Sequence, residues 1–225
     1  MPLLSVVVPA YNEAKTIRQI LEKIHSLDLD KEIIVVDNGS NDDTAKILRD
    51  INYNNLKVIH LASNRGKGGA VLTGISNATG EFVITQDADL EYDPNDYLKL
   101  LAAIKESRVE LILGVRFSKG YHGLFMHRLG NRFLTGLLNF LFNSKLNDYA
   151  TCYKLARKQT WDALSLKGMG FNIDVEIVCN AIKKKYRILE IPISYYPRNY
   201  KEGKKIRWWD GLWTIFYMFK YRFVD

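Results

Sequence analysis

Cysteine and long apolar segments are both scarce in this sequence of 225 residues. The two cysteines, Cys152 and Cys179, are far apart and not in a C-x-x-C spacing, which favours free thiols in a reducing compartment, although a single disulfide stays open. No stretch reaches the roughly 18 to 20 uninterrupted apolar residues that cross a bilayer. The apolar run near the N-terminus is too short for a signal peptide and lacks a basic region. We therefore expect a cytoplasmic protein without a membrane-spanning helix.

Linkers, low-complexity tracts and internal repeats are also lacking, so one domain with a C-terminal elaboration is the simplest organisation. Positive charge is in excess, with 32 lysines and arginines against 25 acidic residues and a formal net charge of +7. This excess fits an anionic partner, such as a nucleotide, a lipid phosphate, an acidic membrane or a nucleic acid, and solubility alone is the alternative. The apolar fraction of 47% is ordinary for a globular domain.

Strands and helices alternate in the first half of the chain. Apolar runs predict strands at residues 3–9, 32–37, 57–61, 81–86 and 110–115, and periodicity or start signals predict helices at 13–26, from 42, at 68–77 and from 94 to about 107. This alternation predicts an α/β fold, a doubly wound sheet that binds ligands at the carboxyl ends of its strands. After residue 116 we expect helices at 124–142, 174–184 and 208–223, and strands at 149–155 and 187–196.

Three acids follow one of these strands. Asp87, Asp89 and Glu91 would share one side if the chain stayed extended. Carboxylates that converge in this way repel one another unless a cation lies among them, and their hard oxygens favour Mg²⁺ or Mn²⁺. Such a metal would neutralise a diphosphate leaving group. A solvated acidic turn is the alternative.

Two further features belong to the same predicted edge of the sheet. Asp37 ends a strand, where an acid commonly accepts hydrogen bonds from a ribose or base, and a turn or helix-capping role is the alternative. The glycine-rich loop at residues 64–69 precedes a helix and could present backbone N–H groups to an anion. A purely structural turn is equally compatible with that loop.

Four motifs occur in a fixed order: Pro9-Ala10-Tyr11-Asn12-Glu13, Val36-Asp37-Asn38-Gly39-Ser40, Asn64-Arg65-Gly66-Lys67-Gly68 and Asp87-Ala88-Asp89. In this order and spacing the chain resembles the family 2 inverting glycosyltransferases, which have the GT-A fold, and within them the dolichyl-phosphate mannosyltransferase and glucosyltransferase branch. The resemblance extends from residue 3 to about 207. We accordingly expect a GT-A domain at 1–207, with a nucleotide-sugar-binding half at 1–116 and an acceptor-binding half at 117–207, and then an amphipathic membrane-proximal helix at 208–225.

The resemblance also implies roles for single residues. Those at positions that hold the nucleotide-sugar are Pro9, Tyr11, Glu13, Asp37, Lys67, Ala88 and Arg116. Asp87 and Asp89 match the catalytic D-x-D pair, and a Mg²⁺ or Mn²⁺ ion would be held by Asp87, Asp89 and Glu91. Many members have an acid where this chain has Asn38, and several have glutamine in place of Glu91.

Basic residues after the sheet indicate the acceptor. Arg128 and Arg132 are spaced i, i+4 on the apolar helix expected at 124–142. Paired guanidinium groups on such a helix suit a phosphate joined to a hydrocarbon chain, and surface pairs with acids are the alternative. Arg198, like Arg116, matches a position that contacts donor or acceptor phosphate in the lipid-phosphate branch. The expected partners are thus GDP-mannose or UDP-glucose and a polyprenyl or dolichyl phosphate.

The last predicted helix is rich in aromatic residues. Its apolar face consists of Trp209, Leu212, Trp213, Phe216 and Phe223, and the flanking cations are Lys204, Lys205, Arg207, Lys220 and Arg222. Tryptophan beside cations suits a helix in the headgroup region of a membrane, and packing against the domain is the alternative. Longer relatives continue into a membrane anchor, so we expect docking through this helix alone or through a membrane-anchoring partner subunit.

The acceptor decides whether a general base is needed. A lipid phosphate is already anionic near neutral pH, so alignment and stabilisation of the leaving diphosphate suffice. A hydroxyl acceptor in cell-envelope glycan synthesis requires a base, for which Asp148, Asp174 and Glu176 are candidates. Asp148 matches a family acid and is counted with the catalytic residues.

Two other functions are less favoured. Polymer-forming relatives have a Q-x-x-R-W motif, and this chain has Lys204 where the glutamine should be, which counts against polymerisation. A non-catalytic nucleotide-sensing or nucleic-acid-binding module would use the net positive charge and the aromatic and basic residues at 195–209. The acids at 87–91 would repel phosphate without a metal, so we expect no nucleic acid as a partner.

Overall fold

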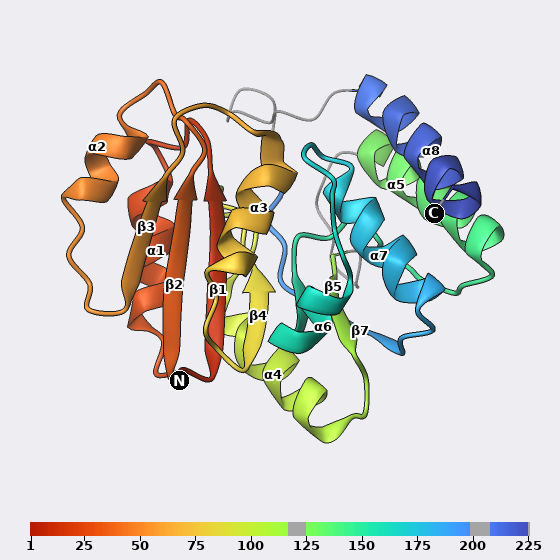
Figure 1. Cartoon of the computed structure of the whole chain (residues 1–225), viewed down its shortest axis with the longest axis horizontal. Coiled ribbons are helices and arrows are strands. Elements are labelled where there is room, and N and C mark those ends of the chain that lie inside the picture. Colours follow the sequence, from red (N-terminus) through yellow and green to blue (C-terminus); the bar gives the residue numbers. More distant parts are fainter. Residues whose placement is uncertain (117–124, 199–207, 225) are drawn as a thin grey trace.

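The computed structural model describes residues 1–116, 125–198 and 208–224, and the side chains of all of these except 125–127 and 208. Seven strands form one sheet in the order β3-β2-β1-β4-β6-β5-β7 (Figure 1). The strands are β1 (Leu4–Ala10), β2 (Lys31–Asp37), β3 (Leu56–His60), β4 (Phe82–Thr85), β5 (Leu111–Val115), β6 (Lys154–Arg157) and β7 (Ile188–Pro192). All neighbouring strands are parallel except at β6, which is antiparallel to β4 and β5.

Helices cover both faces of the sheet. They are α1 (Ile17–Ser26), α2 (Thr44–Arg49), α3 (Gly66–Ser76), α4 (Tyr97–Glu106) after a 3₁₀ turn at Pro94–Asp96, α5 (Phe125–Phe142), α6 (Lys158–Ala163), α7 (Ile173–Lys183) and α8 (Trp208–Phe223). None of the helices within the described residues is long and apolar enough to span a bilayer. The predicted α/β class and its mostly parallel sheet are confirmed.

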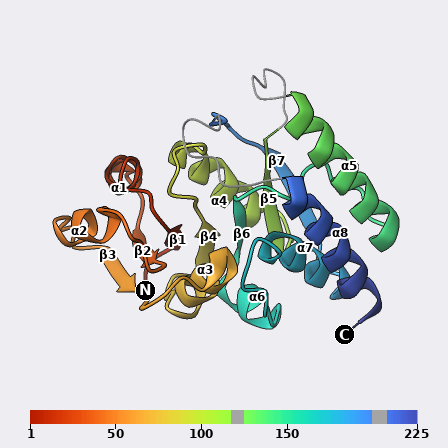
Figure 2. The same cartoon turned by 90° about the horizontal axis from the view of Figure 1, so that it is seen from above.

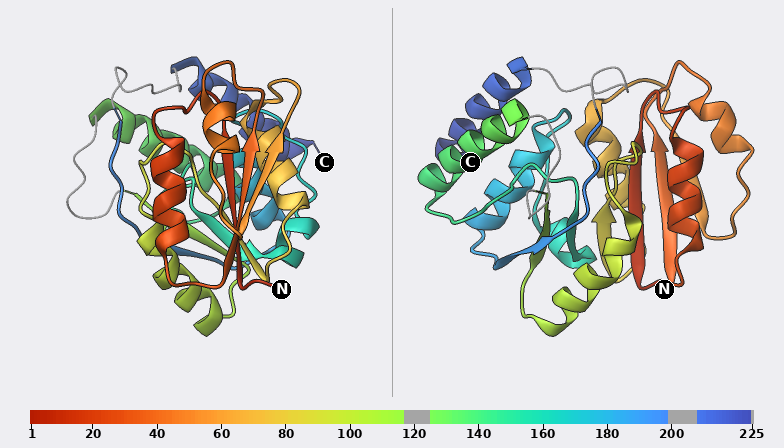
Figure 3. Two further views of the ribbon diagram at one scale, coloured as in Figure 1. Left: turned by 90° about the vertical axis from the view of Figure 1, so that its left-hand side faces the viewer. Right: turned by 180° about the vertical axis from the view of Figure 1, so that it is seen from behind.

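Side-chain alternation along the strands divides the core into two layers. In β1, Leu4, Val6 and Val8 pack with α1 and α4, whereas Val7 packs with α3 on the other face. Figure 3 shows α1 and α4 on the face opposite to α3 and α7. Because both faces are covered, the central parallel strands are apolar nearly throughout, and this property made them visible in the sequence.

The region around β6 differs from the predictions. The strand expected at 149–155 is only β6 (Lys154–Arg157), because the residues before it form turns that bury Tyr149 and Cys152. Tyr153 is also buried, and its carbonyl accepts a hydrogen bond from the Gly114 amide of β5. Buried aromatic residues at such a turn have the same composition as a strand. The short helix α6 was missed, since its six residues contain too few apolar positions for a helical period.

The C-terminal helix α8 packs on the domain and also exposes the aromatic face expected from its sequence. Met218 is fully buried, and Tyr217 and Tyr221 pack against the layer that contains α5 and α7. The opposite face exposes 43% to 74% of each of the residues Trp209, Leu212, Trp213, Phe216, Phe219 and Phe223. Figures 1 and 2 show α8 and α5 side by side at one end of the molecule. The basic residues predicted before α8 lie outside the described residues, as do 117–124.

The amino ends of the central strands are joined by one carboxylate. Glu32 in β2 accepts hydrogen bonds from the Ser5 hydroxyl in β1, from the amide and hydroxyl of Thr79, and from the amide of Gly80 just before β4. Burial opposes ionisation, but these hydrogen bonds outweigh it and lower the pKa of Glu32. Glu32 therefore ties three strands together at the edge opposite to the ligand-binding end.

We expect Glu32→Gln to make stability less dependent on pH. A lowered pKa in the folded state means that ionised Glu32 stabilises the fold above its ordinary pKa of about 4.3, and that this contribution is lost as the pH falls. Thermal unfolding followed by circular dichroism should show a smaller drop in Tm between pH 7 and pH 3 in the variant than in the wild type. Parallel curves for the two proteins would contradict this role.

Candidate active site

The carboxyl ends of β1, β2 and β4 meet at one edge of the sheet. Ala10 lies opposite Asp37 and Val7 lies opposite Thr85 in the parallel ladders. Three of the four motifs found in the sequence lie at this edge, two of them across the ends of β1 and β2 and the third just after β4. Pro9 lines the same small cavity as Lys67 and Asp87. The structure therefore gathers these motifs where sheets of this kind bind ligands.

Asp37 ends β2 as a buried carboxylate. Its Oδ2 accepts a hydrogen bond of 2.9 Å from Nδ1 of His60, and its Oδ1 accepts one of 3.1 Å from the amide of Ser40. His60 ends β3 opposite Asp37, and its side chain is 41% exposed. The sequence analysis missed His60, because its place beside Asp37 depends on the register of two strands.

The loops after β1 and β2 are tied to each other by Asn12. Its φ of 53° is left-handed, a conformation that asparagine tolerates better than most residues. Its amide donates to the Ser40 hydroxyl at 3.0 Å, and its side-chain oxygen accepts from the amide of Asn41 at 2.8 Å. This contact fixes the segment that contains Tyr11 and Glu13 against the turn after Asp37.

Asn38 joins the glycine-rich loop to the same edge. Its side-chain oxygen accepts from the Arg65 amide at 2.8 Å, while its NH₂ group donates to Asn64 Oδ1 and to the Gly66 carbonyl, both at 3.0 Å. An amide can both accept and donate, whereas an ionised acid can only accept. The departure from the family's second acid therefore has a structural reason at this position.

The glycine-rich loop does not present its backbone amides to an anion as the sequence suggested. The amides of Gly68 and Gly69 donate to the carbonyls of Gly170 and Met169. A Cβ atom on Gly68 would lie 2.0 Å from the Gly168 carbonyl oxygen. These glycines are therefore required by close packing against the loop between α6 and α7, and the anion-binding capacity of the loop rests on the Lys67 side chain.

Lys67 and Asp87 form a partly buried ion pair at this edge of the sheet. The Lys67 ammonium lies 3.1 Å from Asp87 Oδ1, and their side chains are 18% and 23% exposed. Burial opposes the charge, but Asp174 and Asp87 raise the pKa of Lys67 well above its ordinary value. The lysine is therefore a permanent cation beside the first acid of the D-x-D motif.

The acidic segment turns instead of staying extended. Residues 88–90 form a turn in which Leu90 has a left-handed φ of 63°, and Ala88 is buried. Asp89 and Glu91 consequently contact Arg198, whereas Asp87 pairs with Lys67. The geometry expected from an extended chain, with all three acids on one side, was wrong.

Arg198 neutralises the second half of the acidic segment. Its guanidinium lies 2.8 Å from Asp89 Oδ2 and 3.3 Å from Glu13 Oε2, and its backbone amide donates to Glu91 Oε1 at 2.8 Å. Burial, with the charges of Asp87 and Glu91, outweighs Arg198 and raises the pKa of Asp89 to about 7. The acids therefore lie in a site with more negative charge than this one arginine offsets.

No three Asp, Glu, His or Cys side chains are grouped as a metal site within the described residues. Asp89 and Glu91 nevertheless supply hard carboxylate oxygens around a shared cation, and the raised pKa of Asp89 indicates that further positive charge would be favourable there. The oxygens of Asp89 and Glu91 thus fit a divalent cation at the position that the Arg198 guanidinium occupies. Asp87 is paired with Lys67 instead.

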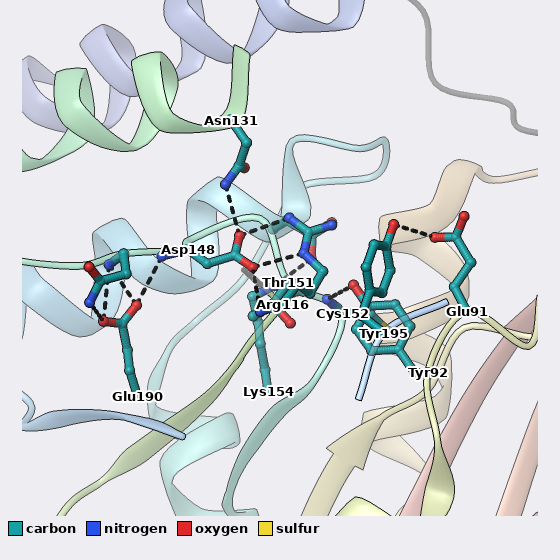
Figure 4. A network of polar contacts seen from close by, with 12 residues as sticks. Glu91, Tyr92, Arg116, Asn131, Asp148, Thr151, Cys152, Lys154, Glu190 and Tyr195 are labelled. Carbon is teal, nitrogen blue, oxygen red and sulfur yellow. Dashed lines mark hydrogen bonds and ion pairs between the residues drawn. The ribbon is translucent and has the colours of Figure 1, made fainter. Parts of the chain in front are cut away.

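Arg116 and Asp148 form a second buried cluster (Figure 4). Asp148 is fully buried, and its two oxygens accept hydrogen bonds of 2.8 Å from Nε and Nη2 of Arg116. Asn131 of α5 donates to the same carboxylate at 3.1 Å, and the Asp148 amide donates to Glu190 at 3.0 Å. Asn131 and Glu190 were not predicted as partners of Asp148, because they contact it from distant segments of the chain.

The two clusters are connected by an aromatic side chain. The Arg116 guanidinium lies over the ring of Tyr195, 5.4 Å from its centroid, and the Tyr195 hydroxyl donates to Glu91 Oε2 at 2.8 Å. Figure 4 shows Tyr195 between Glu91 and the Arg116 group. Arg116 is therefore linked through Tyr195 to Glu91, the last acid of the acidic segment.

Arg128 and Arg132 lie on α5 near Asn131. Arg128 is half-buried and Arg132 is exposed. Around them Leu129 and Phe133 are 51% and 64% exposed. The two arginines are thus part of a partly apolar surface of α5.

These features are those of a GT-A glycosyltransferase, the class that the motifs predicted. The chain belongs to glycosyl transferase family 2, whose profile matches residues 5–164. It is 28% identical over 207 residues to undecaprenyl-phosphate 4-deoxy-4-formamido-L-arabinose transferase of Proteus mirabilis, with 89% of this chain and 62% of the relative covered. It is 29% identical over 209 residues to dolichol-phosphate mannosyltransferase of Pyrococcus furiosus, covering 89% of this chain and 58% of that protein.

The chain therefore spans about 60% of the length of these curated relatives. Among solved structures, it is similar to glucosyl-3-phosphoglycerate synthase of Mycobacterium tuberculosis in complex with Mn²⁺, UDP and phosphoglyceric acid. The TM-score is 0.76 at 18% identity, with 100% of this chain and 80% of that chain covered. At this identity the likeness supports the fold.

We expect Asn38→Asp to destabilise the protein by about 1 to 3 kcal/mol. The change removes the two hydrogen bonds that the Asn38 NH₂ group donates and leaves a buried carboxylate facing two acceptors. Urea unfolding would measure the difference. Asn41→Asp is the matched control, because Asn41 is exposed in the same turn and should change stability by less than about 0.5 kcal/mol. Equal stability of Asn38→Asp and wild type would refute the assigned contacts.

Proposed function

We propose that this chain transfers a hexose from a nucleotide-sugar to a polyprenyl phosphate at a membrane surface, with inversion at the anomeric carbon. Mannose is favoured and glucose comes next, with GDP-mannose or UDP-glucose as the donor. The names of the two relatives, which both include a polyprenyl or dolichol phosphate, support this acceptor class. The protein would work at the cytoplasmic face of the membrane as a peripheral protein.

The proposal rests on the hydrogen bonds that the three candidate general bases already accept. Asp148 is fully buried against Arg116, and Asp174 accepts from Lys67 and Lys154. Glu176 is buried and accepts from the amides of residues 167 and 168. Each of these acids is already engaged by nearby donors, so none is placed to deprotonate a hydroxyl. A phosphate acceptor is nucleophilic without such help.

The reaction would be a single displacement. A phosphate oxygen of the acceptor bonds to the anomeric carbon as the bond from that carbon to the nucleoside diphosphate breaks, and the leaving diphosphate takes the electron pair. On the donor side we assign Pro9, Tyr11, Glu13, Asp37, Lys67 and Ala88. On the acceptor side Arg116, held by Asp148, would bind phosphate together with Arg128 and Arg132.

Asp89 and Glu91 would hold Mg²⁺ or Mn²⁺, with Asp87 on its margin. When bound, such an ion neutralises charge on the leaving diphosphate. Arg198 now takes that place between the acids, so in this proposal its guanidinium moves off Asp89 when the metal and donor bind. It would then be available to the acceptor phosphate, the role expected from its sequence position.

We expect Arg198→Gln to bind Mn²⁺ more tightly than wild type in the absence of nucleotide. Removing the competing cation leaves Asp89 and Glu91 to the metal, with a gain of roughly tenfold in affinity, or about 1.4 kcal/mol. Electron paramagnetic resonance titration of free Mn²⁺ measures this directly. Arg187→Gln serves as a control, since Arg187 is an exposed arginine paired with Glu110 far from the site. Unchanged or weaker Mn²⁺ binding in Arg198→Gln would rule out the competition.

The exposed aromatic face of α8 suits the headgroup region of a membrane. Tryptophan and phenylalanine side chains there are half to three-quarters exposed, and the exposed cations Lys220 and Arg222 lie in its last turn. Burial of each large apolar side chain favours membrane binding by about 1.5 to 3 kcal/mol. A membrane-anchoring partner subunit would add to this attachment.

Transfer itself is tested with radiolabelled GDP-mannose, UDP-glucose and UDP-N-acetylglucosamine and with polyprenyl phosphate in anionic vesicles or in detergent. We expect Mn²⁺- or Mg²⁺-dependent label in the organic phase with one donor, and none with Asp89→Asn. Trp213→Ala/Phe216→Ala should lower transfer about tenfold or more in vesicles but not in detergent.

Leu98→Ala is the matched control for that double variant, since Leu98 is 52% exposed on α4 at a distance from α8. It should behave as wild type in both media. Label that stays in the aqueous phase with every donor would overturn the lipid-phosphate acceptor. Label that moves only onto a soluble glycan primer would favour the hydroxyl-acceptor alternative.

A further inference from the structure

Beneath the donor site, four charged side chains form a continuous row of alternating sign. The row runs from Lys154 to Asp174, then to Lys67 and finally to Asp87. The three contacts are 2.6 Å between Lys154 Nζ and Asp174 Oδ1, 3.4 Å between Asp174 Oδ2 and Lys67 Nζ, and 3.1 Å between Lys67 Nζ and Asp87 Oδ1. The last two groups belong to the proposed donor site, and the first two have no role in the reaction described above.

The members of the row come from both parts of the chain. Lys67 is in the first turn of α3 and Asp87 follows β4, whereas Lys154 opens β6 and Asp174 is in the first turn of α7. The sequence analysis assigned 117–207 to the acceptor. The row shows that this part also contacts a donor-site cation directly.

Burial makes the row energetically coupled. The Lys154 side chain is fully buried, and its ammonium also donates to the Thr151 carbonyl. Burial alone would raise the pKa of Asp174, but Lys154 and Lys67 lower it, so Asp174 is ionised. The other three side chains of the row are 17% to 23% exposed, so these charges are only partly solvated and interact more strongly with their neighbours than surface charges do.

Asp174 is shared between two ammonium groups, and this sharing sets the position of Lys67. If Lys154 were absent, Asp174 would attract Lys67 alone and compete more strongly with Asp87 for it. If Asp174 were absent, two buried lysines would lack their common anion. With both present, the Lys67 ammonium lies between two carboxylates, within 3.4 Å of each.

We propose that Asp174 and Lys154 are positioning residues of the donor site, which hold the Lys67 ammonium against Asp87 so that it can bind the diphosphate of a nucleotide-sugar. This inference rests on the proposed function, because it presumes that a nucleoside diphosphate binds at this edge. It also removes Asp174 from the candidate bases and assigns it to the donor instead of the acceptor.

The test is a double-mutant cycle read out as nucleotide affinity. Calorimetry with UDP and with GDP, each with Mn²⁺, is applied to wild type, Asp174→Asn, Lys67→Ala and Asp174→Asn/Lys67→Ala. We expect Asp174→Asn to weaken binding about tenfold in the wild-type background, the effect of losing one charge-assisted contact. In the Lys67→Ala background the same change should alter affinity by less than about twofold, since the group that it positions is gone.

A purely structural role gives a different pattern. Asp174→Asn would then lower the Tm in both backgrounds while nucleotide affinity stayed unchanged, or would weaken binding equally with and without Lys67, and either result overturns the positioning role. Glu32→Gln is the matched control: it removes a carboxylate with several hydrogen bonds at the opposite edge of the sheet and should leave nucleotide affinity at the wild-type value.

Lys154→Met provides a second, independent variant in case Asp174→Asn does not fold. It keeps Asp174 paired with Lys67 and fills the buried site with a side chain of similar length. It should also weaken nucleotide binding, and only when Lys67 is present; wild-type affinity in Lys154→Met would overturn the proposal. If wild type itself binds neither UDP nor GDP, the proposed function fails, whereas normal wild-type binding with unaffected variants refutes the positioning role alone.

Discussion

The parallel pairing of β1 with β2 and β4 is the constraint on which the candidate site depends. It brings Asp37, the segment after Ala10 and the acids after Thr85 to one edge, although they are separated by up to about eighty residues in sequence. Gathering acids at one edge is unfavourable unless cations accompany them. The structure supplies such cations from other segments, with Lys67 beside Asp87 and Arg198 beside Asp89, while His60 forms a hydrogen bond with Asp37.

Pairing with two different cations also divides the acidic segment into two parts. Asp87 is held by Lys67 and belongs to the sheet edge, whereas Asp89 and Glu91 lie beyond a left-handed turn and are joined by Arg198. Tyr195 then connects Glu91 to Arg116 and so to Asp148. The acidic segment and the Arg116–Asp148 pair are thus in contact through side chains, and a charge change in one of them affects the electrostatics of the other.

Much of the fold was predictable because it depends on local patterns. Buried parallel strands appear as apolar runs, and the helices α1, α4 and α7 were located to within a few residues from their periodicity. The site was predictable only in part. Asp37, Lys67 and Asp89 belong to recognisable motifs, but His60, Asn131, Lys154 and Glu190 acquire their places from contacts with distant segments, and a single sequence contains no local signal for such contacts. Asn38 was predictable only in part: the sequence showed that it departs from the family pattern, but not which contacts explain the departure.

The position of β6 between β4 and β5 has a consequence for the order in which the sheet assembles. In the described part of the chain β5 pairs only with β6 and β7, and β6 alone joins β5 to β4. A nascent chain that has emerged only as far as β5 therefore cannot attach that strand to the rest of the sheet, because the strand that fits between has not yet been synthesised. The gap in the sheet closes when β6 inserts between two strands made before it, and this insertion places Lys154 where Asp174 of α7 pairs with it. Such non-local pairing slows folding, and the charged row is complete only when α7, which follows β6 in the chain, supplies Asp174 between Lys154 and Lys67.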